Sequence, residues 1–315
     1  MPSPLISVII PCYNAEKYVK ESIDSILRQT YSNLEIVIVD DCSSDNTLSI
    51  LKGIAAKDNR VKLFCHAENK KLIHTLNECI DYCHGDFIAR MDSDDISEPT
   101  RLQEQITFLL KNPNYDVCGT SAQLIDEDGK KLSKKKMITC RPIISEIAAM
   151  GNFIIHPSVM MRRSVLLNNK YDSSFPSAED YELWCRLLCK QDIKMTNLPF
   201  VGLKYRISNN QISSAFSNEQ VVISKKIILD YGLVDPKYIS LHMAIFFGVS
   251  REKTNDSQDE TYIRLLFKKI RKINFLCRFG YYRFIMSYLR KKNRRLFYKC
   301  FFINPDLFFL LFKRY

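Results

Sequence analysis

Three aspartates occupy four consecutive positions, at Asp92, Asp94 and Asp95, directly after the apolar run at 87–91. Like charges this close repel one another unless a cation or hydrogen-bond donors compensate them. Carboxylate oxygens at an open site suit Mg²⁺ or Mn²⁺, with water and substrate phosphates completing the coordination. The pattern therefore predicts a divalent-metal site for a phosphate-bearing substrate. The alternative is a solvated acidic turn in which Asp95 or Ser97 caps the next helix.

The elements that position these acids alternate between strand and helix patterns over the first 120 residues. Continuous apolar, β-branched runs predict strands buried on both faces, and apolar stripes at helical spacing separate them. We expect strands at 5–11, 34–40, 61–66 and 87–91, and helices at about 15–28, within 43–57, at 72–83 and from Pro99 to Pro113. Asn14 is expected to cap the first helix. This order predicts an α/β fold with a mostly parallel sheet and helices on both faces.

A second group of acids, Asp40 and Asp41, ends the run at 34–40. Ligands of such sheets bind beyond the carboxyl ends of the strands. If this strand and the one at 87–91 are neighbours, five carboxylates meet at one edge of the sheet.

Beyond Val117 the pattern changes. We expect extended segments with a turn at Asp128–Gly129, a further strand or edge segment at 154–163, a helix beginning near 177–179, extended structure at 198–208 and helices from about 218 onward. This predicts a catalytic domain at 1–215 and a C-terminal helical region at 216–315.

The segments SVIIPCYNAEKYVKESIDSILRQTYSNLEIVIVDDCSSDNT and GDFIARMDSDD closely resemble the family-2 glycosyltransferases with a Rossmann-like GT-A fold. The resemblance covers roughly residues 5–212. It implies an inverting transfer of a sugar from a nucleotide-diphosphate donor, expected to be a UDP-sugar, with Mn²⁺ or Mg²⁺ as cofactor. It also implies a role in the assembly of bacterial surface polysaccharide.

The resemblance assigns the donor site residue by residue. It implies that Asp40 or Asp41 contacts the nucleobase, that Asp92 contacts the ribose and that Asp94 holds the metal on the diphosphate. Three residues of the PCYN segment would lie against the nucleotide: Pro11, Tyr13 and Asn14.

The resemblance also implies a general base in the segment AEDYELWCRL, where Glu179 and Asp180 open a helix. Asp180 would take the proton of the acceptor hydroxyl as that oxygen attacks the anomeric carbon. The helix dipole keeps this carboxylate ionised, and burial or the neighbouring Glu179 would raise its pKa. The alternative is that both acids only complement the helix dipole.

Two further residues, Arg206 and His156, match the family pattern, and Trp184 is a candidate for the acceptor side. Arg206 would lie near the diphosphate, or else be a surface residue of a strand. His156 would lie on the acceptor side, although a lone histidine is more often structural. Trp184, the only tryptophan, would stack on an acceptor sugar or pack in the core with its apolar helix stripe.

Two positions depart from the family pattern. Ser208 stands where the family often has a histidine near the metal or diphosphate, so water would replace one protein ligand. Lys71 stands where the family usually has glycine, which changes the backbone freedom of that loop and adds a phosphate contact or a solvent-facing charge.

The charge of the chain is concentrated at one end. The net charge is +11, yet residues 261–315 hold fifteen lysines and arginines against one acid, Asp306, interleaved with aromatic residues. Amphipathic basic helices of this kind bind anionic membrane surfaces. The alternatives are a helical subdomain packed on the catalytic domain or a dimerisation surface. Nucleic-acid binding does not fit the slightly acidic remainder of the chain.

The rest of the composition sets broad limits. The chain is 46% hydrophobic, its eleven cysteines form no CxxC pair, and no run approaches the roughly 18 apolar residues of a spanning helix. The N-terminus lacks the pattern of a signal peptide. We therefore expect reduced thiols and a cytoplasmic protein, peripheral on the inner face of the membrane.

The sequence thus predicts transfer of a sugar to a hydroxyl of a lipid-linked or polysaccharide acceptor. The alternative is a non-catalytic, membrane-tethered nucleotide-sugar-binding or scaffold protein. A third hypothesis, a basic nucleic-acid binder, would require salt-dependent binding through the C-terminal region.

Overall fold

The computed structural model of the chain describes residues 3–139, 144, 148–190, 193–207, 218–247, 249, 256–270 and 285. The residues group into two compact units, Met1–Thr139 with Phe153–Ala215, and Cys140–Asn152 with Phe216–Tyr315. The segment Cys140–Asn152 thus belongs to the second unit, a grouping that no sequence pattern indicated. The division of function at residue 215 stays a prediction.

The centre of the first unit is a set of parallel strands. β1 (Ile6–Cys12) and β2 (Leu34–Asp40) are buried along their whole length, as their continuous apolar runs require. β3 (Val61–Cys65) pairs with β2, and β4 (Phe87–Arg90) pairs with the other side of β1, all in parallel. The four predicted strands are confirmed.

The described part of the chain forms one nine-stranded sheet in the order β3-β2-β1-β4-β8-β6-β9-β5, with β7 paired to β6. The remaining strands are β5 (Ile96–Ser97), β6 (Val117–Ile125), β7 (Lys131–Lys135), β8 (Met160–Arg162) and β9 (Met195–Arg206). The segment expected at 154–163 is a 3₁₀ turn, η2 (His156–Ser158), followed by the interior strand β8, so the strand alternative is confirmed and the edge alternative is wrong.

The strand order reverses beside β1, because β2 and β3 add on one side of it and β4 on the other. Such a switch point leaves a crevice beyond the carboxyl ends of the strands. β1 also separates β2 from β4, so the two groups of acids do not end neighbouring strands. Two strand spacings, about 10 Å, separate the strands that bear them.

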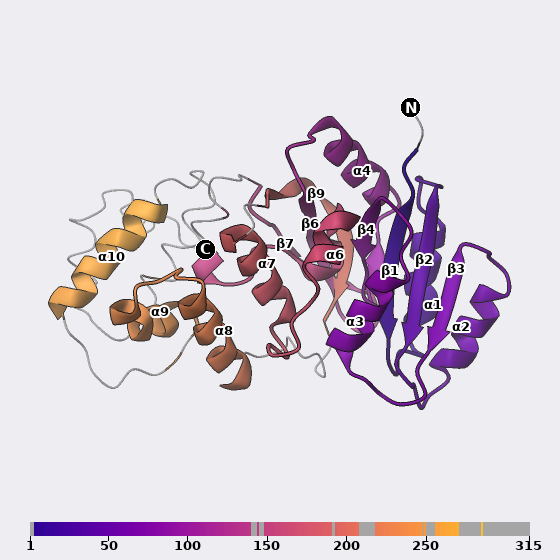
Figure 1. Cartoon of the computed structure of the whole chain (residues 1–315), viewed down its shortest axis with the longest axis horizontal. Helices are drawn as coiled ribbons and strands as arrows, with labels where there is room; N and C mark the ends of the chain where they lie inside the picture. The colour runs from indigo at the N-terminus through magenta and orange to yellow at the C-terminus, as the bar shows by residue number, and fades with distance from the viewer. Residues whose placement is uncertain are drawn as a thin grey trace. The chain divides into compact units, whose positions relative to one another are not determined.

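Helices lie on both faces of this sheet (Figure 1). Those of the first unit are α1 (Val19–Leu27), α2 (Thr47–Ala55), α3 (Leu72–Asp81), α4 (Arg101–Lys111), α6 (Arg163–Asn168) and α7 (Glu179–Lys190). The helix α1 begins four residues later than predicted, and Tyr18 precedes it. Asn14 is therefore not its cap. It adopts a positive φ of 47° in the turn after β1.

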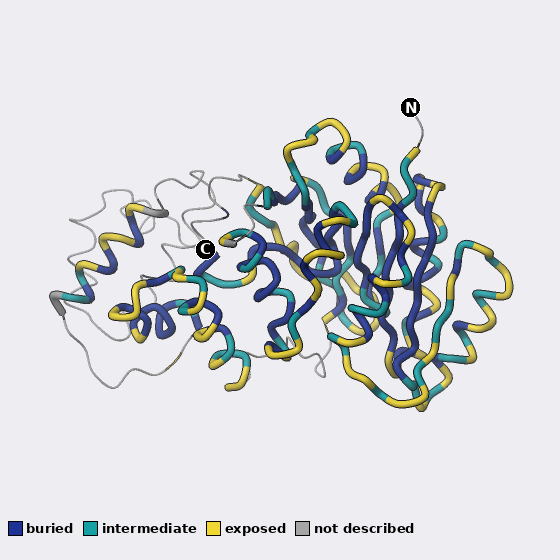
Figure 2. Tube along the Cα trace, viewed as in Figure 1, coloured by how far each residue is buried: buried dark blue, intermediate teal, exposed yellow. Residues whose placement is uncertain are grey.

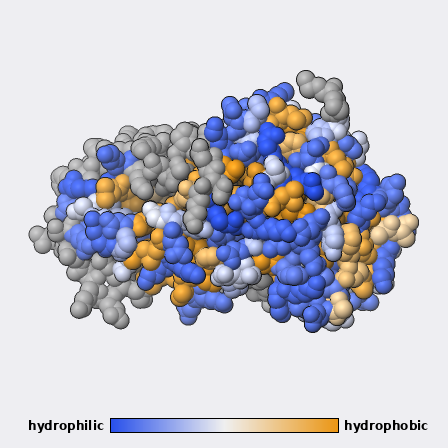
Figure 3. Space-filling model, in the orientation of Figure 1, coloured by the Kyte–Doolittle hydropathy of each residue, from blue (hydrophilic) through white to orange (hydrophobic). Residues whose placement is uncertain are grey.

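Burial follows the layers of the first unit. The central strands are buried, whereas the outer sides of α1, α2 and α4 are exposed (Figure 2). On the face shown in Figure 3, hydrophobic residues occur in small groups among hydrophilic ones. Scattered exposure of this kind is normal for a folded domain.

The second unit is helical where it is described. It contains η1 (Ala148–Met150), α8 (Asn218–Asp230), η3 (Pro236–Tyr238), α9 (Ile239–Phe246) and α10 (Asp256–Ile270). The apolar side chains of α10 at Ile263, Leu266 and Phe267 are buried, so this face packs inside the protein. Membrane binding by the C-terminal region stays a prediction.

Most of the basic C-terminal region, and Ser208, lie outside the described residues. Within the described residues, every helix falls short of the length and apolar character that crossing a membrane requires.

Candidate active site

The loop after β4 brings the three aspartates together. Asp92, Asp94 and Asp95 can each offer one carboxylate oxygen, and these oxygens all lie within 4.8 Å of one another. Asp95 is 1% exposed and accepts a 2.8 Å hydrogen bond from the backbone N–H of Arg206 through Oδ1. Neither Asp95 nor Ser97 caps α4, which Thr100 precedes. The acidic-turn alternative is therefore wrong, because this loop is partly buried and held from β9.

Two buried arginines, Arg90 and Arg101, compensate the negative charge of the acids. The guanidinium of Arg90, whose side chain is 5% exposed, forms an ion pair with Asp92. Its Nε and Nη1 have no hydrogen-bond partner. Arg101 is fully buried and donates a 2.8 Å hydrogen bond to the carbonyl of Arg90. Burial lowers the pKa of Arg101 to about 10, which leaves it charged at neutral pH.

Arg206 lies behind the acid loop, with a side chain that is 2% exposed. Its Nε donates to the carbonyl of Asp94 at 2.8 Å, and Nη1 donates to the carbonyls of Asp126 and Glu127 at 3.1 and 3.0 Å. Its Nη2 lies 2.9 Å from Glu21. The surface alternative for Arg206 is wrong. The residue joins α1, the acid loop and the β6–β7 turn, and a contact with the diphosphate stays a prediction.

The aspartate loop fits a hard divalent cation. All three groups are carboxylates, the ligands that Mg²⁺ and Mn²⁺ prefer. Oδ2 of Asp95 is buried and has no hydrogen-bond partner. Burial, with the charges of Asp92 and Asp94, raises the pKa of Asp95 well above its ordinary value. An added cation would compensate both the missing partner and the repulsion.

A second acid pair, Asp40 and Asp41, lies at the carboxyl end of β2. Asp40 is 1% exposed, and its carboxylate accepts hydrogen bonds from the Ser43 hydroxyl at 2.6 Å and the Ser43 N–H at 3.1 Å. Asp41 is 4% exposed and binds the loop after β3. Burial first, then the charges of Asp40 and Asp92, raises the pKa of Cys12. Acids from β2 and β4 thus converge on the end of β1.

The PCYN segment forms the turn out of β1. Pro11 is buried in the strand, whereas Tyr13 is 52% exposed. Asn14 accepts a 2.9 Å hydrogen bond from the N–H of Ser44, and its own N–H donates to Ser43 at 3.0 Å. This turn and the loop after β2 therefore brace each other beside Asp40.

Glu179 and Asp180 begin α7, as predicted. Glu179 is 8% exposed, and Asp180 is half-buried. Burial and the charge of Asp180 raise the pKa of Glu179 to about 7. The charge of Asp180 favours the protonated form of Lys135, on the exposed strand β7. A carboxyl group that titrates near neutral pH is suited to proton transfer.

The two acceptor-side aromatic residues are buried. His156 Nε2 lies 2.7 Å from the Tyr171 hydroxyl, and burial lowers the pKa of His156 well below its ordinary value. Trp184 is 0% exposed and packs edge-on against His156. Both positions favour the structural alternatives for these residues.

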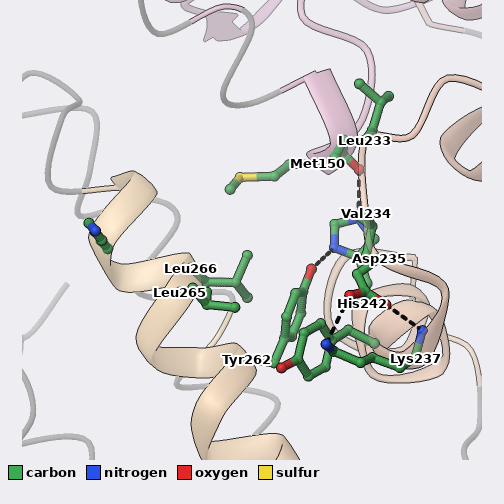
Figure 4. Close-up of a pocket in the computed structure, with 12 residues that line it drawn as sticks. Met150, Leu233, Val234, Asp235, Lys237, His242, Tyr262, Leu265 and Leu266 are labelled. Atoms are coloured by element: carbon green, nitrogen blue, oxygen red, sulfur yellow. Dashed lines mark hydrogen bonds and ion pairs between the residues drawn. The ribbon is translucent and has the colours of Figure 1, made fainter.

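A separate cavity of about 410 Å³ lies within the second unit and contains none of the predicted site residues. Its lining includes Met150, Leu233, Leu265 and Leu266, and His242 bridges Tyr262 and the carbonyl of Ala149 (Figure 4).

Three buried side chains near the acids were missed by the sequence analysis: Arg90, which pairs with Asp92, Arg101, which binds the carbonyl of Arg90, and His66, which contacts Asp41. A charged residue inside a doubly buried strand is rare unless it is paired, and this signal could have identified Arg90. His66 follows β3 at the same edge as Asp40, so its position was a usable signal. Nothing local identifies Arg101, because its partners lie on other elements.

Comparison with known proteins decides the family. The family model "Glycosyl transferase family 2" matches residues 7–168, half of the chain. The chain belongs to glycosyl transferase family 2. This family 2 glycosyltransferase is 38% identical over 237 residues to an uncharacterized glycosyltransferase of Haemophilus influenzae, covering 71% of this chain and 72% of the relative.

Two relatives from Escherichia coli have more specific names. The O-antigen biosynthesis glycosyltransferase WbnJ is 39% identical over 210 residues, covering 65% of this chain and 80% of the relative. The UDP-Glc:alpha-D-GlcNAc-diphosphoundecaprenol beta-1,3-glucosyltransferase WfgD is 35% identical over 216 residues, covering 67% and 80%.

Solved structures show the fold of this family 2 glycosyltransferase. TarS of Staphylococcus aureus, residues 1–349 in complex with UDP-GlcNAc, matches with a TM-score of 0.60 and 19% identity, over 93% of this chain and 89% of that chain. The mannosyltransferase PcManGT of Pyrobaculum calidifontis, in complex with GDP-Man and Mn²⁺, matches with a TM-score of 0.58 and 14% identity, over 85% and 74%. The predicted GT-A fold is confirmed.

Proposed function

We propose that this glycosyltransferase is a metal-dependent, inverting enzyme that transfers a sugar from a UDP-sugar to a hydroxyl of a lipid-linked or polysaccharide acceptor. The observation that carries the proposal is the aspartate loop after β4, where three carboxylates offer oxygens within 4.8 Å of one another and the buried Oδ2 of Asp95 has no hydrogen-bond partner. The complexes of TarS with UDP-GlcNAc and the name of WfgD support the donor and acceptor classes.

The donor half of the site is assigned to the carboxyl ends of β1, β2 and β4. Asp40 or Asp41 would accept from the base, with Pro11, Tyr13 and Asn14 alongside. Asp92 would accept from the ribose hydroxyls. A bound Mn²⁺ or Mg²⁺ would be held by Asp94, with Asp95 as a further oxygen ligand, and would supply positive charge to the leaving diphosphate.

The chemical step is assigned to the start of α7. Asp180 accepts the proton of the acceptor hydroxyl while that oxygen bonds to the anomeric carbon. The bond from this carbon to the phosphate oxygen breaks, and its electron pair leaves with the nucleoside diphosphate. Attack opposite the leaving group inverts the anomeric configuration. Glu179 precedes the base in the sequence, and the charge of Asp180 helps to raise the pKa of Glu179 to about 7.

Arg206 is assigned to holding the acid loop. Its three contacts with backbone carbonyls and its contact with Glu21 fix the position of the Asp94 main chain.

We also propose that the enzyme acts at the cytoplasmic face of the membrane, with the basic C-terminal region near anionic lipid.

The test is release of nucleotide and transfer of sugar from a panel of nucleotide sugars, with Mn²⁺ or with a chelator. Asp94→Ala should abolish transfer and weaken metal-dependent UDP binding. Asp180→Asn should lower transfer by at least about 100-fold and leave UDP binding intact. Asp24→Asn, which alters a partly exposed acid of α1 that pairs with Lys20, serves as control. Full transfer by Asp180→Asn would show that the base is another group. Donor binding without transfer or hydrolysis would favour the non-catalytic alternative.

A further inference from the structure

The side chain of His66 lies between two carboxylates at the end of β3. Nδ1 is 2.7 Å from Oδ1 of Asp41, Nε2 contacts Oε2 of Glu78, and the side chain is 5% exposed. Because both ring nitrogens face acceptors, both carry protons and the ring is an imidazolium. Burial lowers the pKa of His66, but its hydrogen bonds with Asp41 and Glu78 outweigh this and raise that pKa above its ordinary value.

The carboxylate of Asp41 also binds the loop that leads into α3. Its Oδ1 accepts from the N–H of Lys70 at 2.8 Å, and its Oδ2 accepts from the N–H of Lys71 at 2.9 Å. The imidazolium thus fixes the carboxylate, and the carboxylate fixes two consecutive backbone amides.

The backbone of Lys71 is strained. Its φ of 73° and ψ of 160° fall in a region that residues other than glycine rarely adopt. Contacts from both sides hold it there, because its N–H is bound by Asp41 and Asn69 and its carbonyl accepts from the N–H and hydroxyl of Thr75 at 3.1 and 3.0 Å. Such a conformation persists only where the surroundings over-determine it.

We propose that His66 is a positioning residue of the donor site, which acts through Asp41 on the strained Lys71 and so sets the 66–71 loop against the nucleobase before the donor binds. The inference rests on the proposed function, because it assigns this loop to the nucleotide end of that site. Asp41 directly follows β2, which pairs in parallel with β1 and β3, and its side chain is 5% exposed. The loop that it anchors therefore lies at the carboxyl ends of these strands, at the same edge of the sheet as Asp40 and the turn after β1.

The charged groups around His66 allow a matched control. Glu78 also contacts Nζ of Lys70 at 2.9 Å and Nε2 of His74 at 2.9 Å, and the His74 side chain is 52% exposed. Asp41 and Glu78 thus contact the imidazolium directly, and Lys70 and His74 act on it through Glu78. His74→Gln removes a histidine that contacts the same glutamate but not Asp41.

The experiment measures UDP affinity by calorimetry with Mn²⁺ at pH 6, where the imidazolium is populated. His66→Gln should weaken UDP binding about tenfold, the lower end of the loss caused by removing outer-shell partners of metal ligands, and His74→Gln should leave it unchanged. In a Lys71→Gly background the strain is absent, so His66→Gln should cost clearly less than tenfold. The wild-type affinity should also fall as the pH rises through the raised pKa of His66, and that fall should be absent in His66→Gln.

Equal UDP affinity of the wild type and His66→Gln would overturn the inference. An equal loss in His74→Gln, or an undiminished loss in the Lys71→Gly background, would overturn it as well. If His66→Gln does not fold, Glu78→Gln tests the far end of the same chain of contacts with the same expected loss. A wild type that binds no nucleoside diphosphate, with UDP, GDP, CDP and ADP all tried, would instead overturn the proposed function and this inference with it.

Discussion

Replacing Asp95 by asparagine tests whether the charge of the acid loop opposes folding. Oδ1 of Asp95 accepts from the N–H of Arg206 at 2.8 Å, and asparagine keeps that acceptor. Oδ2 is buried without a partner, and the carboxylates of Asp92, Asp94 and Asp95 offer oxygens within 4.8 Å of one another. An amide N–H₂ in this cluster would add a donor and remove one of the three charges. Asp95→Asn should therefore stabilise the metal-free protein while it weakens metal binding.

The magnitude follows from the burial of this group. A buried polar atom without a partner costs about 1–3 kcal/mol, so the free energy of unfolding should rise by about that amount at neutral pH. For a unit of this size, each kcal/mol corresponds to about 2–4 °C. The raised pKa of Asp95 gives the sign. The cost of the charged Asp95 carboxylate is present at pH values above 3.8, its ordinary pKa, and vanishes at lower pH. The stability that Asp95→Asn gains should therefore disappear in acid.

Thermal unfolding with a chelator, from pH 4 to pH 7.5, measures this effect. Asp92→Asn is the control with the opposite sign, because it leaves the buried guanidinium of Arg90 without its carboxylate. Added Mn²⁺ should stabilise the wild type more than Asp95→Asn. A lower unfolding temperature for Asp95→Asn, or shifts of the same sign in both variants, would refute the reasoning.

Three more predictions concern other groups. The wild-type free energy of unfolding should fall as the pH rises from about 4.5 to about 7, because buried Glu179 keeps a proton that the unfolded chain has lost, and Glu179→Gln should remove this fall in pH-dependent denaturation. Arg206→Met should lower the free energy of unfolding by about 2 kcal/mol or more in urea, because three backbone carbonyls lose their donor; an unchanged midpoint would contradict this. Because the folded protein raises the pKa of His66, protonated His66 should stabilise the protein at pH values below 6.5, its ordinary pKa. This contribution should be lost as the pH rises through the folded pKa, and His66→Gln should not show this loss in thermal unfolding.

Much of the first unit could be predicted from local patterns. β1 and β2 are uninterrupted apolar runs, and their burial along the whole length follows from that composition. The helix that begins at Glu179 was also placed correctly. Helix starts were less reliable, as the late start of α1 shows, because Asn14 uses its side chain to hold Ser44 instead.

The electrostatic argument from the sequence was incomplete. Crowded aspartates predicted a metal, and the geometry of the loop fits one. The structure adds that buried Arg90 and Arg101 lie beneath the same loop, so part of the compensation comes from the protein itself. Lys71 was known to replace a family glycine, but its positive φ could not be inferred from the sequence.

By itself, the sequence determined the alternation of strands and helices, the acids at the strand ends and the resemblance to family 2. Only the tertiary structure decided that β1 separates the two groups of acids, that Arg206 holds the acid loop and that His66 joins Asp41 to Glu78. The physical reason is the separation along the chain of the residues that make contact. Burial patterns arise from neighbouring residues, whereas strand order and buried polar pairs depend on contacts between residues far apart in the chain, which composition and spacing do not encode locally.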